Sequence, residues 1–199
     1  MKKHFHIILL TPEGYHDKEI HILNELFLAG LDTLHVRKPG FSKQKLRDYL
    51  AGIPRRFHKK TVIHSHYSLL KEFDLKGIHL TEKTRRKKLP VFFNRKKHAL
   101  SASFHSIHDV KSSRRKYDHI FLSPVFNSIS KKNYKSIFDR EELTGFLRNK
   151  NNITALGGIS DKNIKLVKQM GFAGAAVLGF IWENKSPRQA YKKLASKIK

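Results

Sequence analysis

Short apolar runs alternate along this chain with segments in which apolar residues recur every three to four positions. The runs are continuously apolar, as expected of strands buried on both faces of a parallel sheet. We predict strands at His6–Thr11, Thr33–Arg37, Thr61–His64, Gly77–Leu80, Ala99–Ser103, His119–Leu122, Asn152–Leu156 and Gly174–Leu178.

The segments between these runs carry helical spacing. It is found at Ile20–Phe27, Leu46–Leu50, Leu69–Phe73, Leu143–Leu147 and Ile164–Val167. A last helix is predicted from Pro187, a residue that suits the first helical turn, to about Lys197. Eight strand–helix units in 199 residues predict an α/β fold with a single domain over residues 1–199, closed as a (β/α)8 TIM barrel. A doubly wound open sheet is the structural alternative.

Glycines follow the last two predicted strands. The seventh strand ends in Gly157-Gly158, and the eighth runs to Gly179. Glycine lets backbone N–H groups come close to an anion, and the loops after strands 7 and 8 hold phosphate in many barrels of this kind. We therefore predict a phosphate site at Gly157, Gly158, Gly179 and Phe180.

The longest irregular stretch is Ser123–Phe138, directly after the sixth strand. Long loops in compact domains often carry function, so this segment is expected to contribute to the site.

The chain is strongly basic, with 41 Lys and Arg against 16 Asp and Glu, a formal net charge of +25. Such a surface attracts phosphorylated substrates and polyanions. The basic residues gather in Arg85–Lys88, Arg95–His98 and Lys111–Lys116, which we interpret as solvated faces. Because no zinc-finger, RRM or KH signature accompanies the charge, nucleic-acid binding is expected to be at most non-specific.

Cysteine is absent, which excludes disulfides, thiolate zinc sites and a cysteine nucleophile. The longest apolar runs, such as Ile7–Leu10, are far too short to span a membrane, and no signal peptide is recognisable. We therefore expect a cytoplasmic protein with no membrane partner.

Histidines stand at four consecutive strand ends, where the active site of a (β/α)8 barrel lies. They are His35, His64, His79 and His105, and Glu82 is the one acidic group nearby. This balance suits an anionic ligand and proton transfer, since histidine acts as acid or base near neutral pH. We predict no metal site, because hard cations need oxygen ligands.

His105, bracketed by two serines after the fifth strand, is our best candidate for a catalytic residue. Arg37 is a natural phosphate fork, with a structural ion pair as the alternative. His79 is expected to be structural, while for His35 and His64 structural and functional roles stay open. His64 and His66 could also share one face of a strand and bind zinc, but no third ligand is apparent.

In this order, the motifs resemble the thiamine phosphate synthase/TenI superfamily of (β/α)8 barrels over almost the whole chain. The family's Gly-x-His-Leu matches Gly77–Leu80, and its Ser-x-His matches Ser103–His105. Its proline-containing loop with serines or threonines and a lysine matches Ser123–Lys131, and its Gly-Gly-Ile matches Gly157–Ile159. The strand 2 motif matches in place only at Arg37.

The resemblance implies a small phosphorylated substrate, a thiazole phosphate. It implies catalytic roles for His105 and Arg37. It also implies substrate contacts by His35, Lys38, His64, Ser103, Ser128, Ser130 and Lys131. The family further suggests a homo-oligomer.

Ser65 and Thr84 stand where the synthase branch carries its magnesium-binding aspartates. We therefore expect a TenI-like enzyme that tautomerises a carboxythiazole phosphate with His105 as acid and base, and without a cofactor. The alternative is thiamine phosphate synthase proper, which couples an aminopyrimidine diphosphate to thiazole phosphate, releases pyrophosphate and would use Mg²⁺. A third possibility is a non-catalytic phosphate-ligand binder or a basic protein that associates with nucleic acid.

Overall fold

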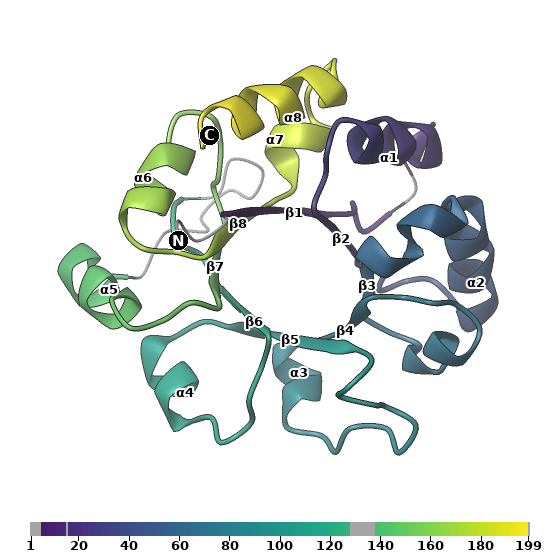
Figure 1. Ribbon diagram of the computed structural model, residues 1–199, viewed down its shortest axis with the longest axis horizontal. Helices are drawn as coiled ribbons and strands as arrows, with labels where there is room; N and C mark the ends of the chain where they lie inside the picture. Colours follow the sequence, from purple (N-terminus) through teal and green to yellow (C-terminus); the bar gives the residue numbers. More distant parts are fainter. Residues whose placement is uncertain (1–4, 15, 128–137, 199) are drawn as a thin grey trace.

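Eight parallel strands close into a barrel in chain order in the computed structural model, which describes residues 5–14, 16–127 and 138–198 (Figure 1). The ring is closed by β1 and β8, where Ile8 pairs with Ala176. The strands are β1 His6–Leu10, β2 Thr33–Val36, β3 Thr61–Ile63, β4 Gly77–Leu80, β5 Ala99–Phe104, β6 His119–Leu122, β7 Ile153–Leu156 and β8 Gly174–Val177. The predicted (β/α)8 barrel is confirmed, and the open sheet is wrong.

Helices surround the barrel and connect successive strands (Figure 1). They are α1 Glu19–Leu28, α2 Lys43–Gly52, α3 Glu82–Arg85, α4 Ile107–Ser112, α5 Arg140–Leu147, α6 Ile164–Gln169, α7 Gly179–Trp182 and α8 Pro187–Ser196, with the 3-10 helices η1 Arg55–Lys60 and η2 Tyr67–Lys71. No helix in these described ranges is long and apolar enough to cross a membrane.

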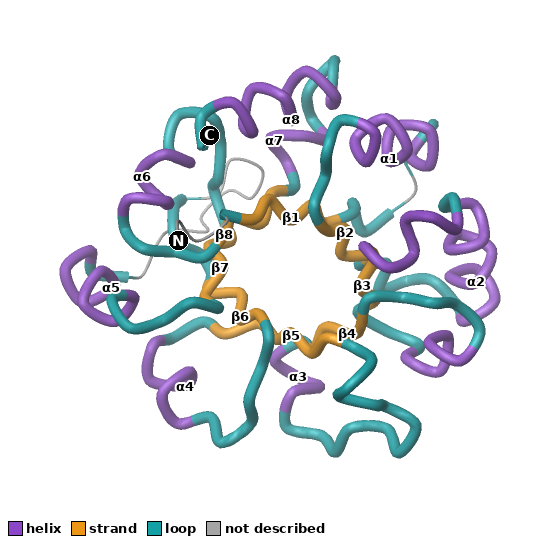
Figure 2. Tube along the Cα trace, viewed as in Figure 1, coloured by secondary structure: helices purple, strands orange, loops and turns teal. Residues whose placement is uncertain are grey.

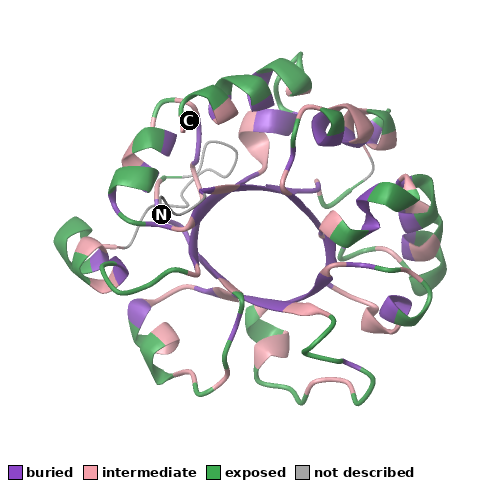
Figure 3. Ribbon diagram, in the orientation of Figure 1, coloured by how far each residue is buried: buried purple, intermediate pink, exposed green. Residues whose placement is uncertain are grey.

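Local chemistry sets where several helices begin. The Ser42 hydroxyl accepts a hydrogen bond from Lys45 N at 3.1 Å at the start of α2, and the Asp139 carboxylate accepts from two amides at the start of α5. Pro187 occupies the first turn of α8, as predicted. Most helices then bury an apolar face, such as Leu23 and Leu26 of α1, against strands that are largely buried (Figure 3). The four-residue α3 has no buried residue.

The crossover from β4 to β5 differs from the other connections. After the four-residue α3, residues 86–98 form turns and loop rather than a helix, as the teal trace shows (Figure 2). Pro90 lacks an N–H donor, and the like charges of Arg86–Lys88 repel one another, so this segment gains little from a helix.

The inside of the barrel has two unlike halves. Ile8, Leu10, Phe121 and Ala176, from strands β1, β6 and β8, form an apolar cluster separate from the main core. The strands on the opposite side contribute polar side chains, which are His35, His79, Ser101 and Ser103, with His64 just after β3. This division places hydrogen-bonding groups along one wall of the site.

Candidate active site

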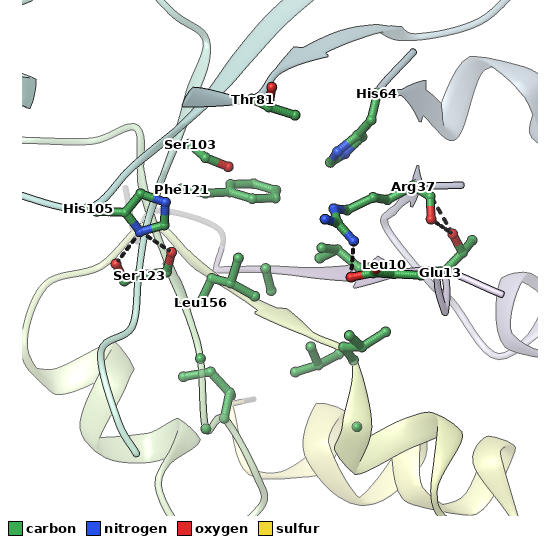
Figure 4. Close-up of a pocket in the computed structure, with 18 of the residues that line it drawn as sticks. Leu10, Glu13, Arg37, His64, Thr81, Ser103, His105, Phe121, Ser123 and Leu156 are labelled. Atoms are coloured by element: carbon green, nitrogen blue, oxygen red, sulfur yellow. Dashed lines mark hydrogen bonds and ion pairs between the residues drawn. The ribbon is translucent and has the colours of Figure 1, made fainter. Parts of the chain in front are cut away.

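A cavity of about 560 Å³ opens at the C-terminal ends of the strands (Figure 4). Its volume is in the range of small-molecule sites. Residues from both halves of the barrel line it, among them Leu10, Glu13, Arg37, His64, Glu82, Lys83, Ser103, His105, Leu156, Gly157, Gly158, Gly179 and Phe180.

His105 follows β5 and is held by the start of the next loop. Its Nδ1 lies 2.9 Å from the carbonyl oxygen of Ser123, and because a carbonyl can only accept, Nδ1 carries the hydrogen. The other ring nitrogen, Nε2, lies 3.8 Å from a carboxylate oxygen of Glu82. His105 therefore offers Nε2 for hydrogen bonding or proton transfer, with a negative charge close by.

Ser103 is oriented by a buried chain of hydrogen bonds. The Ser101 hydroxyl donates to the carbonyl of Ile78 at 3.3 Å and so accepts from His79 Nδ1 at 2.9 Å. His79 Nε2 then lacks a hydrogen and accepts from the Ser103 hydroxyl at 2.8 Å. Ser103 thus turns its lone pairs toward the cavity, where it can accept a hydrogen bond from a ligand. The expected structural role of His79 agrees with these contacts.

His64 and His35 extend this polar wall. His35 Nδ1 lies 3.0 Å from His64 Nε2, and His64 Nδ1 is buried without a hydrogen-bond partner among the described residues. The His64 ring stacks on His79, with centroids 4.2 Å apart. His64 lines the cavity, whereas His35 lies beneath it and is 1% exposed. His35 is thus not brought to the cavity surface, and its predicted substrate contact would have to pass through His64.

Burial keeps this histidine trio, His35, His64 and His79, in the neutral form. Desolvation holds the pKa values of His35 and His64 well below their usual range, and the neighbouring His79 adds to the effect. Desolvation, followed by the positive charge of Arg37, lowers the pKa of His79 to about 3. The neutral rings therefore form hydrogen bonds inside the barrel without placing a positive charge there.

We expect the trio to make the protein sensitive to mild acid. In the unfolded chain these histidines bind protons near pH 6.5, so below that pH the unfolded state binds more protons than the folded state. The free energy of unfolding should fall by about 1.4 kcal/mol per pH unit for each such histidine between about pH 6.5 and 4.5. Urea unfolding at several pH values measures this slope.

The double variant H35Q/H64N replaces two of the three rings with neutral amides. Because burial also lowers the pKa of His119, to about 4, the variant should remove about half of the slope that the histidines produce. His21 and His108 are exposed helical histidines, so H21Q/H108Q is the matched control and should leave the slope unchanged. If the free energy of unfolding of H35Q/H64N depended on pH as steeply as that of the wild type, His35 and His64 would not be the source of the acid sensitivity.

The trio does not fit a metal ion in this arrangement. One ligand atom from each ring lies within 4.8 Å of the others. A metal lies in the plane of each imidazole that binds it, yet the rings of His64 and His79 are stacked with planes only 17° apart. Both nitrogens of His79 are also engaged by serines. His66, considered with His64 for zinc, turns away and lies 2.8 Å through Nε2 from the carbonyl of Phe41.

Arg37 reaches the cavity from just beyond β2. Its guanidinium forms an ion pair with Glu13, and its side chain is 36% exposed. Thr11 fixes the backbone here, since its hydroxyl accepts a hydrogen bond from Arg37 N at 2.9 Å. Part of the guanidinium therefore stays available to a phosphorylated ligand.

Lys38 does not reach the cavity, contrary to the substrate contact expected from the sequence. Its ammonium donates to Glu19 at 2.7 Å and to the carbonyl of Gly14 at 2.6 Å, and its side chain is 0% exposed. Tyr49 completes the cluster by donating to Glu19 at 2.6 Å. Arg37 and Lys38 are adjacent in an extended segment and so point to opposite sides, inward and outward. Lys38 thus stabilises the packing of α1.

Gly157 and Gly158 form the turn after β7 as predicted, and both have positive φ, +98° and +63°. A Cβ at Gly158 would lie 2.2 Å from the carbonyl oxygen of Asn127, so only glycine fits this close approach. Gly179 and Phe180 begin α7 and also line the cavity. Their binding of phosphate stays a prediction.

Ser128, Ser130 and Lys131, expected to contact substrate, lie outside the described residues. The sequence reasoning gave no role to Glu13, which pairs with Arg37 at the cavity rim. The local sequence around Glu13 does not predict this role. Glu13 follows β1 and Arg37 follows β2, so the two residues meet only because these strands pair in the barrel.

The residues present do not fit a magnesium ion at the positions of the family's aspartates. The hydroxyl of Thr84 is engaged by Thr81, with the two side-chain oxygens 3.1 Å apart, and Ser65 offers no carboxylate. The carboxylates that line the cavity in the described part of the chain belong to Glu13 and Glu82, which face Arg37 and His105. The residues outside that part contain no Asp or Glu.

Comparisons with known proteins agree with the geometry. The family model described as thiamine monophosphate synthase matches residues 7–181. A thiamine-phosphate synthase of Latilactobacillus sakei is 26% identical over 95% of this chain and 89% of its own length. A thiamine-phosphate synthase of Prochlorococcus marinus is 27% identical over 75% of this chain, which spans only 44% of that longer protein.

Two solved structures share the barrel. A thiamine phosphate pyrophosphorylase from Bacteroides thetaiotaomicron is 31% identical, with a TM-score of 0.84 over 97% of both chains. A thiamine phosphate pyrophosphorylase from Pyrococcus furiosus has a TM-score of 0.78 over 98% of this chain and 95% of its own, but at 16% identity it shows the fold alone.

Proposed function

The chain belongs to the thiamine monophosphate synthase family, and from this premise we propose that it is an enzyme whose cavity binds a thiazole phosphate. The phosphate is held at Gly157, Gly158 and the start of α7, and the ring lies toward His105. The cavity volume of about 560 Å³ and the position of Gly157, Gly158 and Gly179 in its lining support this placement.

We propose the reaction of thiamine phosphate synthase, because the similar proteins are named for this reaction. In it, the bond between the methylene carbon of an aminopyrimidine diphosphate and the diphosphate oxygen breaks. The ring nitrogen of the thiazole phosphate forms a new bond to that carbon with its lone pair. Pyrophosphate leaves with the bonding electrons, and no proton needs to move.

Departure of the diphosphate needs positive charge at the cavity rim. Arg37 and Lys83 line the cavity and supply it. A guanidinium matches two phosphate oxygens at once, and charge developing on the leaving oxygen is stabilised most when the donors are already in place. Ser65 and Thr84 replace the family's metal-binding carboxylates. Arg37 and Lys83 therefore provide a larger share of the stabilisation of the leaving diphosphate.

A second candidate is the TenI-like tautomerisation of carboxythiazole phosphate, our first expectation from the sequence. Two observations favour it. His105 uses Nδ1 for its hydrogen bond to Ser123 and leaves Nε2 facing Glu82 at 3.8 Å, and few carboxylates line the described part of the cavity. The relatives are named as thiamine-phosphate synthases and not as tautomerases, so we rank this reaction second.

Parallel assays on the purified protein separate the two reactions. One contains aminopyrimidine diphosphate, thiazole phosphate and magnesium, which binds the diphosphate in solution; the other contains the carboxythiazole tautomer without metal. We expect thiamine phosphate to form in the first and no aromatised product in the second. The reverse result would assign the tautomerase reaction, and turnover in neither would contradict an enzymatic role in this pathway.

The cytoplasmic location, the homo-oligomer and the absence of a bound cofactor stay predictions. Size-exclusion chromatography with light scattering measures the oligomeric state directly.

A further inference from the structure

A second hollow lies on the outer wall of the barrel, separated from the cavity by β5. It has a volume of about 310 Å³ and lies beside α3 and α4. Four guanidinium side chains line it, those of Arg85, Arg86, Arg114 and Arg115, with Asp109 as the one acidic group. We call this hollow the arginine groove.

Two of the arginines build the groove. Arg85 donates to the carbonyl of Ser103 at 2.8 Å and to Asp109 at 3.0 Å, and its guanidinium lies 4.1 Å from the Phe104 ring centroid. Arg115 donates to the carbonyls of Arg85 and Lys87, at 2.8 and 3.0 Å. These bonds hold the basic segments 85–88 and 114–116 side by side, although like charges repel.

The other two arginines are free to bind. The side chains of Arg86 and Arg114 are exposed and have no hydrogen bond or ion pair with any residue in the described ranges. The charge of Asp109 is already matched by Arg85, and that of Asp118, at the end of the next loop, by Arg95 at 2.6 Å. The groove is therefore a concave site with unmatched guanidinium groups.

The surrounding sequence extends this charge. Between Glu82 and Asp109 the chain has eight Lys and Arg and no acidic residue, and between Asp109 and Asp118 it has four more. The groove itself presents unpaired Arg86 and Arg114 from two separate segments, so successive phosphates of one strand could contact both of them.

We propose that the arginine groove binds the phosphodiester backbone of single-stranded RNA, without sequence preference. A groove of this size admits one strand, and guanidinium groups fork onto phosphate oxygens. A bilayer surface is broad and flat, and it would meet few of the groups inside the groove. Phe104 lines the groove whereas its neighbours Ser103 and His105 line the cavity, so the two hollows lie on opposite sides of this part of the chain.

Fluorescence anisotropy with a labelled oligouridylate, over a series of salt concentrations, tests the proposal. We expect R86Q/R114Q to weaken binding at least tenfold and to reduce the slope of log affinity against log salt by about 1.4, since two phosphate contacts are lost at about 0.7 each. The matched control R148Q/R188Q removes two exposed arginines elsewhere and should weaken binding less than threefold.

The variant R86K/R114K keeps both charges and perturbs folding least. Its affinity for the oligouridylate should lie between those of the wild type and R86Q/R114Q, because lysine cannot bind two phosphate oxygens as a guanidinium does. Equal weakening in the groove and control variants would overturn the proposal, since the general positive field would then explain binding. Binding to phosphatidylserine vesicles but not to the oligonucleotide would also overturn it. Synthase turnover is measured in parallel, so failure of the proposed reaction is seen separately from failure of RNA binding.

Discussion

Replacing Arg37 by glutamine is expected to lower kcat/KM for thiamine phosphate formation by about 10²- to 10³-fold. The guanidinium lines the cavity and, in our proposal, stabilises the charge that develops on the departing diphosphate. Glutamine keeps a planar polar group, but its side chain is shorter and has no charge. Steady-state kinetics with both substrates varied in turn measures the change.

The control is E13Q, which removes the ion-pair partner of Arg37 and leaves the guanidinium in place. We expect its kcat/KM to stay within about threefold of the wild type, because an exposed ion pair contributes little. If R37Q kept more than half of the wild-type activity, Arg37 would not act on the leaving group.

His105→Ala then distinguishes the two candidate reactions. The coupling reaction moves no proton. The variant should therefore lower kcat/KM for thiamine phosphate formation by less than about tenfold, through poorer positioning of the thiazole. A tautomerase that used His105 Nε2 as acid and base would instead lose about 10²- to 10⁴-fold. A large loss of coupling in this variant would show that His105 does more in the synthase reaction than orient the ring.

The second large effect concerns stability and is expected for Lys38→Ala. Among the described residues, this change leaves Tyr49 as the one side-chain donor to the buried carboxylate of Glu19. Breaking a buried ion pair by removing one partner costs about 3–5 kcal/mol, because the remaining charge is uncompensated. Equilibrium urea unfolding should show this loss in the free energy of unfolding.

The double variant K38M/E19L removes both charges and fills their space with apolar side chains. It should be clearly more stable than K38A, since no charge is then left buried. A double variant as unstable as K38A would mean that the cost comes from packing and not from the unpaired carboxylate.

Strand positions were predictable to within one residue at either end. The reason is physical: a strand covered on both faces is mostly apolar, and it ends where the chain turns into segments such as those that begin at Arg37 or at Gly157-Gly158. Because the active-site end of a barrel follows from strand direction, His64, Ser103 and His105 could also be placed at the cavity.

Side-chain direction was harder to predict. Alternation along β2 could have separated inward Arg37 from outward Lys38, but the buried partner Glu19 lies on a helix and is known only from the tertiary packing. The loop at 86–98 was likewise not foreseen, because charge runs are compatible with either an exposed helix or a loop.

The two unlike halves of the barrel interior bear on how a flat heterocycle is held. One wall offers Leu10, Leu156 and Ala176, and the opposite wall offers His64 and Ser103. A ring with polar atoms on one edge can satisfy both walls in one orientation only, since the reverse would desolvate those atoms against hydrocarbon. In the proposed complex, the two walls therefore select which edge of the heterocycle lies against His64 and Ser103, and this orientation is set before any bond is made.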